Sequence, residues 1–413
     1  MDIIIIGAGA AGLYAATLLG RQGKKVTMLE ARDRTGGRIH TLRDPAFQLP
    51  VEAGAEFVHG DLQLTLKLLK EAGIEYYETD GKLYRSNNGQ LEKQGDFIED
   101  EKDLVKKLKS LEQDISVKTF LEKYFSDAEH EDLRKSLTSF VEGYDAANAG
   151  DTSCFALLQE LLGESNRQYR VKGGYGQLVT WLENECRKFG CDIHLSTIVN
   201  NITWRAGEVV VTTAGNKTFT APKAIVTVPV SILQSAHINI TPMPPAVHES
   251  IQSLGNTGVI KFILQFNEAF WKKNLGFVFS DEIVPTWWTQ LPEQNGMITG
   301  WLAGPASVQH KNETDTQLLE KAIASLAKIF SMEVETVNSM LNYAHVLNWT
   351  NDPFTLGAYA YEKVGAQYAK HILNTPLANT LFLAGEAYHE GPERGTVEAA
   401  LLSAERVVEL MKE

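Results

Sequence analysis

The sequence has few of the residues that mark disulfide-stabilised or metal-binding proteins. Its 413 residues include only three cysteines, Cys154, Cys186 and Cys191, and no CxxC pair. None of its ten histidines belongs to an HExxH motif. The cysteines are therefore expected to be buried free thiols, and no metal site is predicted.

Positive charge is also scarce. Lysine and arginine number 39 against 52 aspartates and glutamates, which gives a formal net charge of −13. This balance argues against a nucleic-acid partner, because neutralising phosphates needs a basic surface. It is compatible with a cationic substrate.

Candidate membrane spans are scarce as well. The candidate we consider is the uncharged stretch over residues 3–20, which is long enough to be tested as a span. That stretch follows Met1-Asp2 rather than a basic segment, and it contains four glycines. We therefore expect neither a signal peptide nor a membrane span, and the sequence predicts a cytoplasmic protein.

The chain is long enough, and at 44% hydrophobic residues apolar enough, for two domains. Leucines at helical spacing predict amphipathic helices between residues 61 and 163. A β-rich run with one helix follows over residues 171–228, and Thr241-Pro-Met-Pro-Pro245 marks a break. Later elements are predicted as a strand over Gly258–Phe266, a helix over Leu318–Phe330, a strand over Leu381–Ala384 and a helix from near Thr396.

The N-terminal stretch has the pattern of a dinucleotide-binding βαβ unit. An apolar run, Ile3–Ile6, leads into Gly7-x-Gly9-x-x-Gly12 and an alanine- and leucine-rich segment, which predicts strand, glycine turn and helix. A second apolar run, Val26–Leu29, ends on Glu30, eighteen positions after Gly12, near the place of the acid that binds a ribose hydroxyl. The glycines allow the turn, the close approach of a pyrophosphate and tight helix packing.

Gly36-Gly37-Arg38 adds a feature that a plain nicotinamide-binding unit does not need, since its arginine can reach the pyrophosphate with a forked donor. The glycine motif, Glu30-Ala31-Arg32, Gly36-Gly37-Arg38 and Glu52-Ala53-Gly54-Ala55 together resemble the flavin-containing amine oxidase family. That family includes monoamine oxidases, polyamine oxidases and flavin-type histone lysine demethylases.

The resemblance implies an α/β fold with two domains. A Rossmann-like FAD-binding domain, discontinuous in sequence, is expected over residues 1–60, 168–235 and 373–413. An α+β substrate domain with a mixed sheet and helices is expected over residues 61–167 and 236–372.

The same resemblance implies the residues that bind FAD. It places the Val199 backbone at the adenine, the turn from Thr227 to Pro229 beside the pyrophosphate, and the helix start at Thr396 and Val397 toward the flavin pyrimidine. A helix N-terminus stabilises negative charge on the reduced ring. The full expected set is Gly7, Gly9, Ala11, Gly12, Glu30, Ala31, Arg32, Gly37, Arg38, Gly54, Ala55, Glu56, Val199, Thr227, Pro229, Trp349, Gly385, Glu386, Thr396 and Val397.

Lys261 is the first candidate catalytic residue. It lies in the predicted strand Gly258–Phe266, whose two faces are both largely apolar, so its ammonium is expected to be partly desolvated. A single lysine in a β-strand usually lies on the solvent-exposed face of the sheet. The match of Gly-x-x-Lys followed by Phe266 and Phe270-Trp271 to the family reverses that expectation, because there the lysine binds a water at flavin N5 and assists reoxidation.

The segment Gly357-Ala-Tyr-Ala-Tyr361 resembles the family motif whose aromatic ring flanks the amine before the flavin. Tyr361 is the preferred match, with Tyr359 close behind. Ala358 lies near the position where monoamine oxidases carry the cysteine bonded to flavin, so non-covalent FAD is expected. Monoamine oxidases have a second tyrosine after the terminal glycine motif, whereas this chain has Gly391-Pro-Glu-Arg-Gly-Thr396, which puts a full aromatic cage in doubt.

The predicted substrate pocket combines an acid, a histidine and aromatic residues. His59 is expected near the substrate, as in the polyamine oxidases that the chain resembles, and is a candidate catalytic residue with Lys261 and Tyr361. Glu56 departs from the small residue of many relatives and is either a pocket carboxylate for a second ammonium or a solvated loop residue. The expected pocket residues are Glu56, His59, Trp287, Trp288, Tyr359 and Tyr361; a hydrophobic core explains tryptophans of this region equally well.

The implied activity is that of an FAD-dependent amine oxidase. A primary or secondary amine, as in monoamines or polyamines, would be oxidised to an imine that hydrolyses to a carbonyl compound, with dioxygen reduced to hydrogen peroxide. The alternatives are an L-amino acid oxidase that uses Arg85, Arg167 or Arg170, a flavoenzyme like the desaturases and protoporphyrinogen oxidases, or a non-catalytic flavin-bound scaffold. The expected partners are the amine and dioxygen, without nucleic acid or membrane, and a homodimer is compatible with the sequence.

Overall fold

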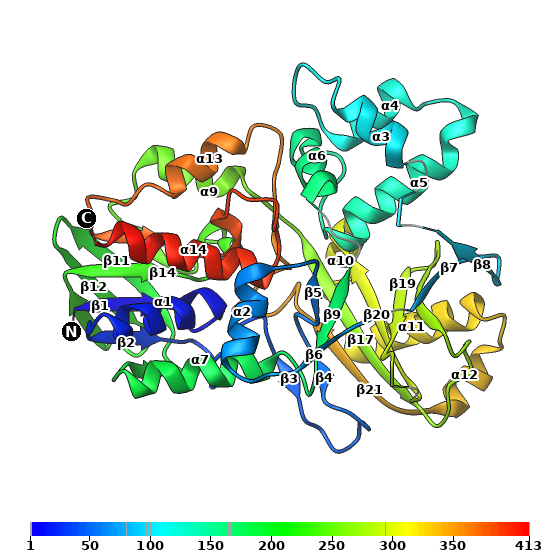
Figure 1. Ribbon diagram of the computed structural model, residues 1–413, viewed down its shortest axis with the longest axis horizontal. Coiled ribbons are helices and arrows are strands. Elements are labelled where there is room, and N and C mark those ends of the chain that lie inside the picture. Colours follow the sequence, from blue (N-terminus) through cyan, green and yellow to red (C-terminus); the bar gives the residue numbers. More distant parts are fainter. Residues whose placement is uncertain are drawn as a thin grey trace.

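The computed structural model describes residues 2–79, 81–95, 97–98, 101–163, 167–293 and 295–412. The chain forms two halves, each built around a large sheet, and both termini lie on the same side of the molecule (Figure 1). The predicted α/β class with a parallel sheet and a mixed sheet is confirmed.

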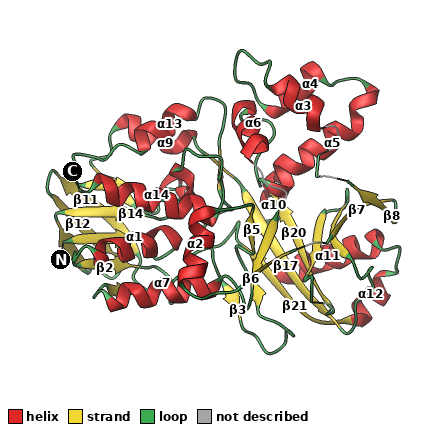
Figure 2. Ribbon diagram, viewed as in Figure 1, coloured by secondary structure: helices red, strands yellow, loops and turns green. Residues whose placement is uncertain are grey.

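The first half contains a five-stranded, fully parallel sheet in the order β10-β2-β1-β14-β23. Ile3 and Ile5 of β1 pack on one face and Ile4 and Ile6 on the other, which explains a continuous apolar run in a strand covered on both sides. The strands are β1 (Ile3–Ile6), β2 (Val26–Leu29), β10 (Asp192–His194), β14 (Lys223–Val226) and β23 (Leu381–Leu383). One face is covered by α1 (Ala10–Arg21), α7 (Gly176–Lys188) and α14 (Val397–Leu410), as Figure 2 shows in red.

The other face packs against a four-stranded sheet and three helices. The sheet has the order β13-β12-β11-β15, with β11 (Val199–Arg205), β12 (Glu208–Thr213), β13 (Thr218–Ala221) and β15 (Asn239–Thr241). The helices are α8 (Val230–Gln234), α9 (Pro245–Ser253) and α13 (Gln367–Leu373). Because α9 and α13 pack on the first half, they favour assigning both helices to the FAD-binding domain, beyond the predicted boundaries at 235 and 373. The division into domains stays a prediction.

The second half is built on a seven-stranded mixed sheet in the order β21-β17-β20-β19-β18-β7-β8. Its strands are β7 (Lys82–Asn87), β8 (Gln90–Gln94), β17 (Gly258–Phe266), β18 (Leu275–Phe279), β19 (Thr286–Thr289), β20 (Met297–Ala303) and β21 (Leu341–Asn348). Between β20 and β21 the chain forms three helices, α10 (Gly304–Gln309), α11 (Asp315–Ile329) and α12 (Val334–Met340). The strand predicted over Gly258–Phe266 is central β17, and every residue in it is buried.

A helical layer lies above the mixed sheet in Figure 1. It comprises α3 (Glu101–Leu108), α4 (Val117–Tyr124), η1 (Ala128–His130), α5 (Glu131–Ser139), the π-helical turn η2 (Phe140–Tyr144) and α6 (Cys154–Gly163). The prediction that the whole segment from 61 to 163 is helical is wrong over residues 76–94. These residues form β6 (Tyr76–Glu78), β7 and β8, because pairing with distant β9 and β18 overrides local leucine spacing.

Small sheets join the two halves. β5 (Phe57–His59) and β6 pair with β9 (Gln168–Val171), β3 (Thr41–Leu42) pairs with β4 (Val51–Glu52), and β16 (Gly255–Asn256) pairs with β22 (Ala360–Tyr361). Buried Glu398 of α14 accepts hydrogen bonds from the backbone amides of Leu64 and Thr65, at 2.8 and 2.6 Å. It thereby caps α2 (Gln63–Glu71) and fixes the chain that follows β5.

In the described residues, no helix has the length and apolar character needed to cross a bilayer. The three cysteines are buried and free, as predicted.

Candidate active site

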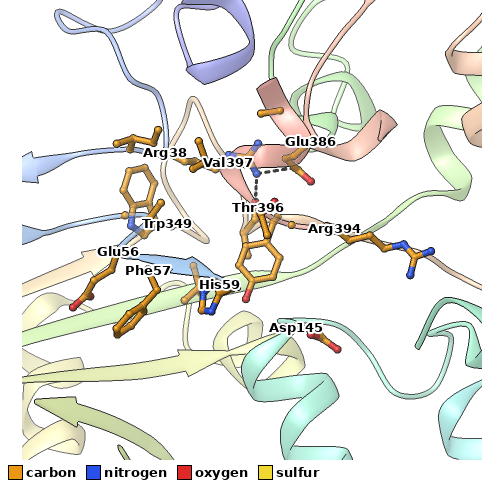
Figure 3. A pocket seen from close by; sticks show the side chains of 18 of the residues that line it. Arg38, Glu56, Phe57, His59, Asp145, Trp349, Glu386, Arg394, Thr396 and Val397 are labelled. Carbon is orange, nitrogen blue, oxygen red and sulfur yellow. Dashed lines mark hydrogen bonds and ion pairs between the residues drawn. The ribbon is translucent and has the colours of Figure 1, made fainter. Parts of the chain in front are cut away.

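A cavity of about 1020 Å³ runs from the glycine turn of the first half to the mixed sheet of the second. This is at the upper end of the roughly 300–1,000 Å³ of small-molecule pockets, as expected for a large cofactor with a substrate beside it. Figure 3 shows Arg38, Glu386 and Val397 on one side of it and Glu56, Phe57 and His59 on the other.

The glycine turn is shaped for a ligand that approaches the backbone. Gly7 has φ +103°, and a Cβ there would lie 2.7 Å from Thr227 Oγ1. A Cβ on Gly12 would lie 2.1 Å from the Gly7 carbonyl oxygen, so Gly12 serves packing. A Cβ on Gly9 would meet nothing within 4 Å and would stand in the open space beside the cavity. The open N-terminus of α1 therefore fits a pyrophosphate.

Glu30 directly follows β2 and lies beside the glycine turn. Its side chain lines the cavity and is only 6% exposed. Its two oxygens accept hydrogen bonds from the backbone amides of Ala8, at 2.7 Å, and Arg32, at 2.9 Å. These contacts fix the carboxylate between the glycine turn and β2.

Arg38 occupies the middle of the cavity wall. Its Nη1 donates to the Ala358 carbonyl oxygen at 2.7 Å and to Glu386 Oε1 at 3.0 Å. The preceding Gly37 has φ +56° and packs on Gly9, which brings the arginine to the turn. Thr396 caps α14 by accepting a hydrogen bond from the Ala399 amide at 3.2 Å, so the predicted helix start is confirmed.

The opposite wall contains a buried ionic cluster of Lys261, Glu56 and Arg170. Lys261 Nζ lies 2.6 Å from Glu56 Oε2 and 3.2 Å from the Gly54 carbonyl oxygen. Arg170 Nη1 lies 2.6 Å from Glu56 Oε1. Burial alone would raise the pKa of Glu56, but Lys261 and Arg170 lower it to about 2. The cluster therefore carries one net positive charge.

This cluster changes the interpretation of Glu56. The side chain is only 7% exposed, so it is not a solvated loop residue. Its oxygens also accept hydrogen bonds from Trp288 Nε1 at 3.0 Å and Gln290 Nε2 at 3.3 Å. Because two protein cations already neutralise it, this arrangement does not favour Glu56 as the receptor of a second substrate ammonium.

His59 faces the same part of the cavity from β5. Its Nδ1 lies 3.0 Å from the Tyr144 hydroxyl. Burial lowers the pKa of His59 to about 4, although the Glu56 carboxylate opposes this shift. His59 is therefore a neutral imidazole at neutral pH, able to hydrogen-bond a substrate without adding charge.

The two adjacent tryptophans of β19 have different environments. Trp288 lines the cavity, whereas Trp287 is completely buried against the core of α11 and donates from Nε1 to the Val284 carbonyl oxygen at 2.9 Å. The prediction that Trp287 belongs to the pocket is wrong. Successive strand residues point to opposite faces, so only one of two neighbours can reach the cavity.

Tyr359 and Tyr361 also have different environments. Tyr359 lines the cavity and its hydroxyl donates to the Tyr144 carbonyl oxygen. Tyr361 packs among the helices α3 to α6 instead, and its hydroxyl donates to Asp151 at 2.9 Å. The preference for Tyr361 as the ring beside the amine is therefore wrong, because Tyr361 of β22 is packed in the helical layer and Tyr359, which precedes that strand, lines the cavity.

The structure gathers most of the predicted residues at one cavity. Those that line it are Gly7, Gly9, Ala11, Glu30, Ala31, Arg32, Gly37, Arg38, Gly54, Ala55, Glu56, His59, Val199, Thr227, Pro229, Lys261, Trp288, Trp349, Tyr359, Gly385, Glu386, Thr396 and Val397. Sequence reasoning missed Tyr144, Phe277 and the acid pair Asp145 and Glu160, which also line it. Their positions depend on long-range packing, and no local motif marks them.

Glu52 belongs to the motif Glu52-Ala53-Gly54-Ala55 that precedes Glu56, and its ionisation near the buried ionic cluster makes the stability of the protein depend on pH. Burial raises its pKa to about 7, against hydrogen bonds from the Tyr175 amide at 2.6 Å and the Thr41 hydroxyl at 2.9 Å. The folded pKa exceeds the ordinary value of 4.5, so stability is fully present below 4.5 and is lost as pH rises through about 7.

Glu52→Gln should remove that loss, amounting to up to about 3 kcal/mol between about pH 5 and pH 8. Urea denaturation of both proteins at the two pH values measures it, with exposed Glu75→Gln as the control variant. Equal pH dependence in the Glu52→Gln variant and the wild type would contradict the assignment.

The parallel βαβ unit, the open glycine turn and the buried lysine across one cavity define a dinucleotide-dependent oxidoreductase. The sequence profile of the flavin containing amine oxidoreductase family matches residues 10–133 and 78–412. The chain belongs to this family and is a flavin amine oxidase.

Curated relatives and solved structures agree with this assignment. The chain is 29% identical to polyamine oxidase 3 of Oryza sativa subsp. japonica, over 99% of this chain and 90% of the rice protein. It is 28% identical to lysine-specific histone demethylase 2 of Homo sapiens, over 98% of this chain and 52% of that protein. Putrescine oxidase bound to putrescine has the same fold, with a TM-score of 0.83, 21% identity and coverage of 99% and 98%. Cyclohexylamine oxidase from Brevibacterium oxydans IH-35A gives a TM-score of 0.82 at 20% identity, with coverage of 100% and 99%.

Proposed function

We propose that this protein binds FAD non-covalently and oxidises a primary or secondary amine to an imine, which hydrolyses to a carbonyl compound. Dioxygen accepts the electrons and leaves as hydrogen peroxide. The observation that carries the proposal is the position of Lys261, a fully buried cation that lines the same cavity as the glycine turn.

The chain offers residues for each part of the cofactor. Gly9 and Arg38 would hold the pyrophosphate, Glu30 a ribose, Val199 the adenine side, and Val397 at the start of α14 the flavin end. Ala358 lines the cavity, while the cysteines are buried elsewhere, so no thiol is in position for a covalent link to the flavin.

A bound flavin supplies the two-electron acceptor for the carbon next to the amine nitrogen. Tyr359 would orient the amine, and neutral His59 would accept or donate a hydrogen bond near it. Lys261 would place a positive charge where negative charge develops on oxygen. The ion pair with Glu56 holds the Lys261 ammonium in that position.

The competing L-amino acid oxidase function receives less support. Arg85, Arg167 and Arg170 all line the cavity, but each has an acidic partner, Asp281, Asp61 and Glu56 respectively. None of them is therefore in place as an uncommitted receptor for an amino acid carboxylate. A cytoplasmic location and a homodimer stay predictions.

Two assays test the proposal. Purified holoenzyme should release hydrogen peroxide with at least one amine of a panel of alkylamines, arylalkylamines, polyamines and amino acids. Acid precipitation should leave the flavin in the supernatant as FAD. Flavin that remains with the precipitated protein would contradict the non-covalent mode, and the absence of peroxide with every amine would contradict the oxidase activity.

A further inference from the structure

Five aromatic rings form a closed circuit on the substrate side of the cavity. The centroid distances are 5.7 Å for Phe57–His59, 5.4 Å for His59–Tyr144, 5.8 Å for Tyr144–Phe97, 5.9 Å for Phe97–Phe277 and 5.7 Å for Phe277–Phe57. All five residues line the cavity. We refer to these five residues as the aromatic collar.

The collar presents apolar surface to a ligand. Each of its side chains is only partly buried although it lies inside the protein, because part of each ring faces the cavity. Leu83, Phe279 and Leu291 extend the apolar wall beyond Phe277. A pocket of this kind gains free energy by burying an aryl or alkyl group.

Aromatic rings also attract cations, but in this part of the cavity cationic side chains of the protein already lie over two of the rings. The Arg170 guanidinium carbon lies 4.5 Å from the centroid of the Phe57 ring, and Lys261 Nζ lies 5.4 Å from that of Trp288. With Glu56 counted, the cluster of Lys261, Glu56 and Arg170 beside the collar keeps one net positive charge, and neighbouring Glu52 adds little negative charge below its raised pKa of about 7. A second positive charge on a substrate would be repelled at this place.

The acids on the other side of Tyr144 do not reverse this balance. Asp145 and Glu160 line the cavity and share a hydrogen bond, so they act as one carboxyl pair. Burial raises the pKa of Glu160, which reduces the charge that the pair carries. Glu393, which also lines the cavity, lies 2.7 Å from His389.

We propose that the substrate is an amine whose remaining part is an uncharged aryl or alkyl group, seated in the aromatic collar. The inference rests on the proposed amine oxidase function and narrows it. It differs from the substrate class that the names of the polyamine oxidase relatives would suggest, because the collar of this chain adjoins a net positive cluster.

Matched amines of equal size test the substrate class. Pentylamine and 1,4-diaminobutane both have six heavy atoms and differ by a terminal methyl group against an ammonium, and 3-aminopropanoate has a terminal carboxylate. With rates expressed per concentration of the species whose reacting nitrogen is neutral, kcat/KM should be at least about ten-fold higher for pentylamine than for 1,4-diaminobutane, whose second ammonium the cluster repels. It should also be higher than for 3-aminopropanoate, because its carboxylate would lose water in the apolar collar while Arg85, Arg167 and Arg170 are already paired with acids. It should be higher again for 2-phenylethylamine. Equal or faster oxidation of 1,4-diaminobutane or 3-aminopropanoate would overturn the inference.

Binding without turnover gives an independent readout. 2-Phenylpropan-2-amine has no hydrogen on its amine-bearing carbon and so cannot be oxidised there. Calorimetric titration of the holoenzyme should show its Kd increase at least about five-fold in Phe277→Ala, since part of the collar is lost. Phe330→Ala, which removes a partly buried ring outside the cavity, should leave the Kd unchanged. An unchanged Kd in Phe277→Ala, or equal weakening in both variants, would refute the collar as the binding place.

Failure of the substrate-class inference can be distinguished from failure of the proposed oxidase function. A protein that oxidises diamines in preference to pentylamine is still an amine oxidase, so only the substrate class would be wrong. A protein whose flavin no amine reduces would contradict the proposed function itself.

Discussion

Replacing Lys261 with methionine is expected to slow turnover at least about ten-fold. Lys261 is the fully buried cation on the substrate side of the cavity, and methionine keeps much of its volume but removes its charge. Negative charge develops on dioxygen as it accepts electrons, and a fixed cation lowers that barrier. Stopped-flow mixing of the reduced enzyme with dioxygen measures the step on which the effect should concentrate.

The control is Lys321→Met, which removes a lysine that pairs with Glu313 on the outer side of α11. Its reoxidation rate should equal that of the wild type. If Lys261→Met also reoxidised at the wild-type rate, Lys261 would not have the assigned role.

Replacing Glu56 with glutamine is expected to destabilise the protein by about 3–5 kcal/mol. The carboxylate lies 2.6 Å from both Lys261 Nζ and Arg170 Nη1, and all three side chains are buried. Without its charge, two buried cations face each other with no compensation. Chemical denaturation at neutral pH measures the loss of unfolding free energy.

Lys261→Met provides the matched comparison, because it leaves Glu56 and Arg170 as a neutral pair and should cost far less stability. Glu56→Gln combined with Lys261→Met should recover part of the loss, since only one cation remains. Equal stability of Glu56→Gln and wild type would show that the ionic cluster does not hold this wall together. The effect is expected to persist in high salt, because a buried cluster is poorly screened.

The cofactor half could be predicted from sequence because its signals are local. Strand, glycine turn, helix and Glu30 follow one another within β1, α1 and β2, where each residue type is required by the backbone or by close packing. The burial of Lys261 could be predicted from the two apolar faces of its strand only together with the family resemblance of Gly-x-x-Lys, since a lone lysine in a strand usually faces solvent.

The substrate half could not be predicted to the same depth. Tyr361 is the preferred match to the motif and Tyr359 the second, and only the packing of Tyr361 in the helical layer leaves Tyr359 as the ring at the cavity. Trp287 and Trp288 are adjacent, so which one lines the cavity depends on which face of β19 is covered by α11. Composition and periodicity carry no information about such choices.

Glu56 illustrates the same limit for charge. Its partners Lys261 and Arg170 are separated from it by more than a hundred residues, and they meet only because β5 pairs with β9 and β17 lies beside them. From sequence, a pocket carboxylate and a solvated glutamate were equally reasonable. The ion pairs make it a buried structural acid that holds Lys261.

Anaerobic reduction of the bound flavin by an amine tests the proposed amine oxidation directly. The oxidised holoenzyme, mixed without dioxygen with 2-phenylethylamine or pentylamine, should lose the visible absorbance of its oxidised flavin, with about one equivalent of amine consumed per flavin. Admission of air should restore the absorbance with release of hydrogen peroxide. Flavin that stays oxidised with all monoamines, polyamines and amino acids would contradict the account.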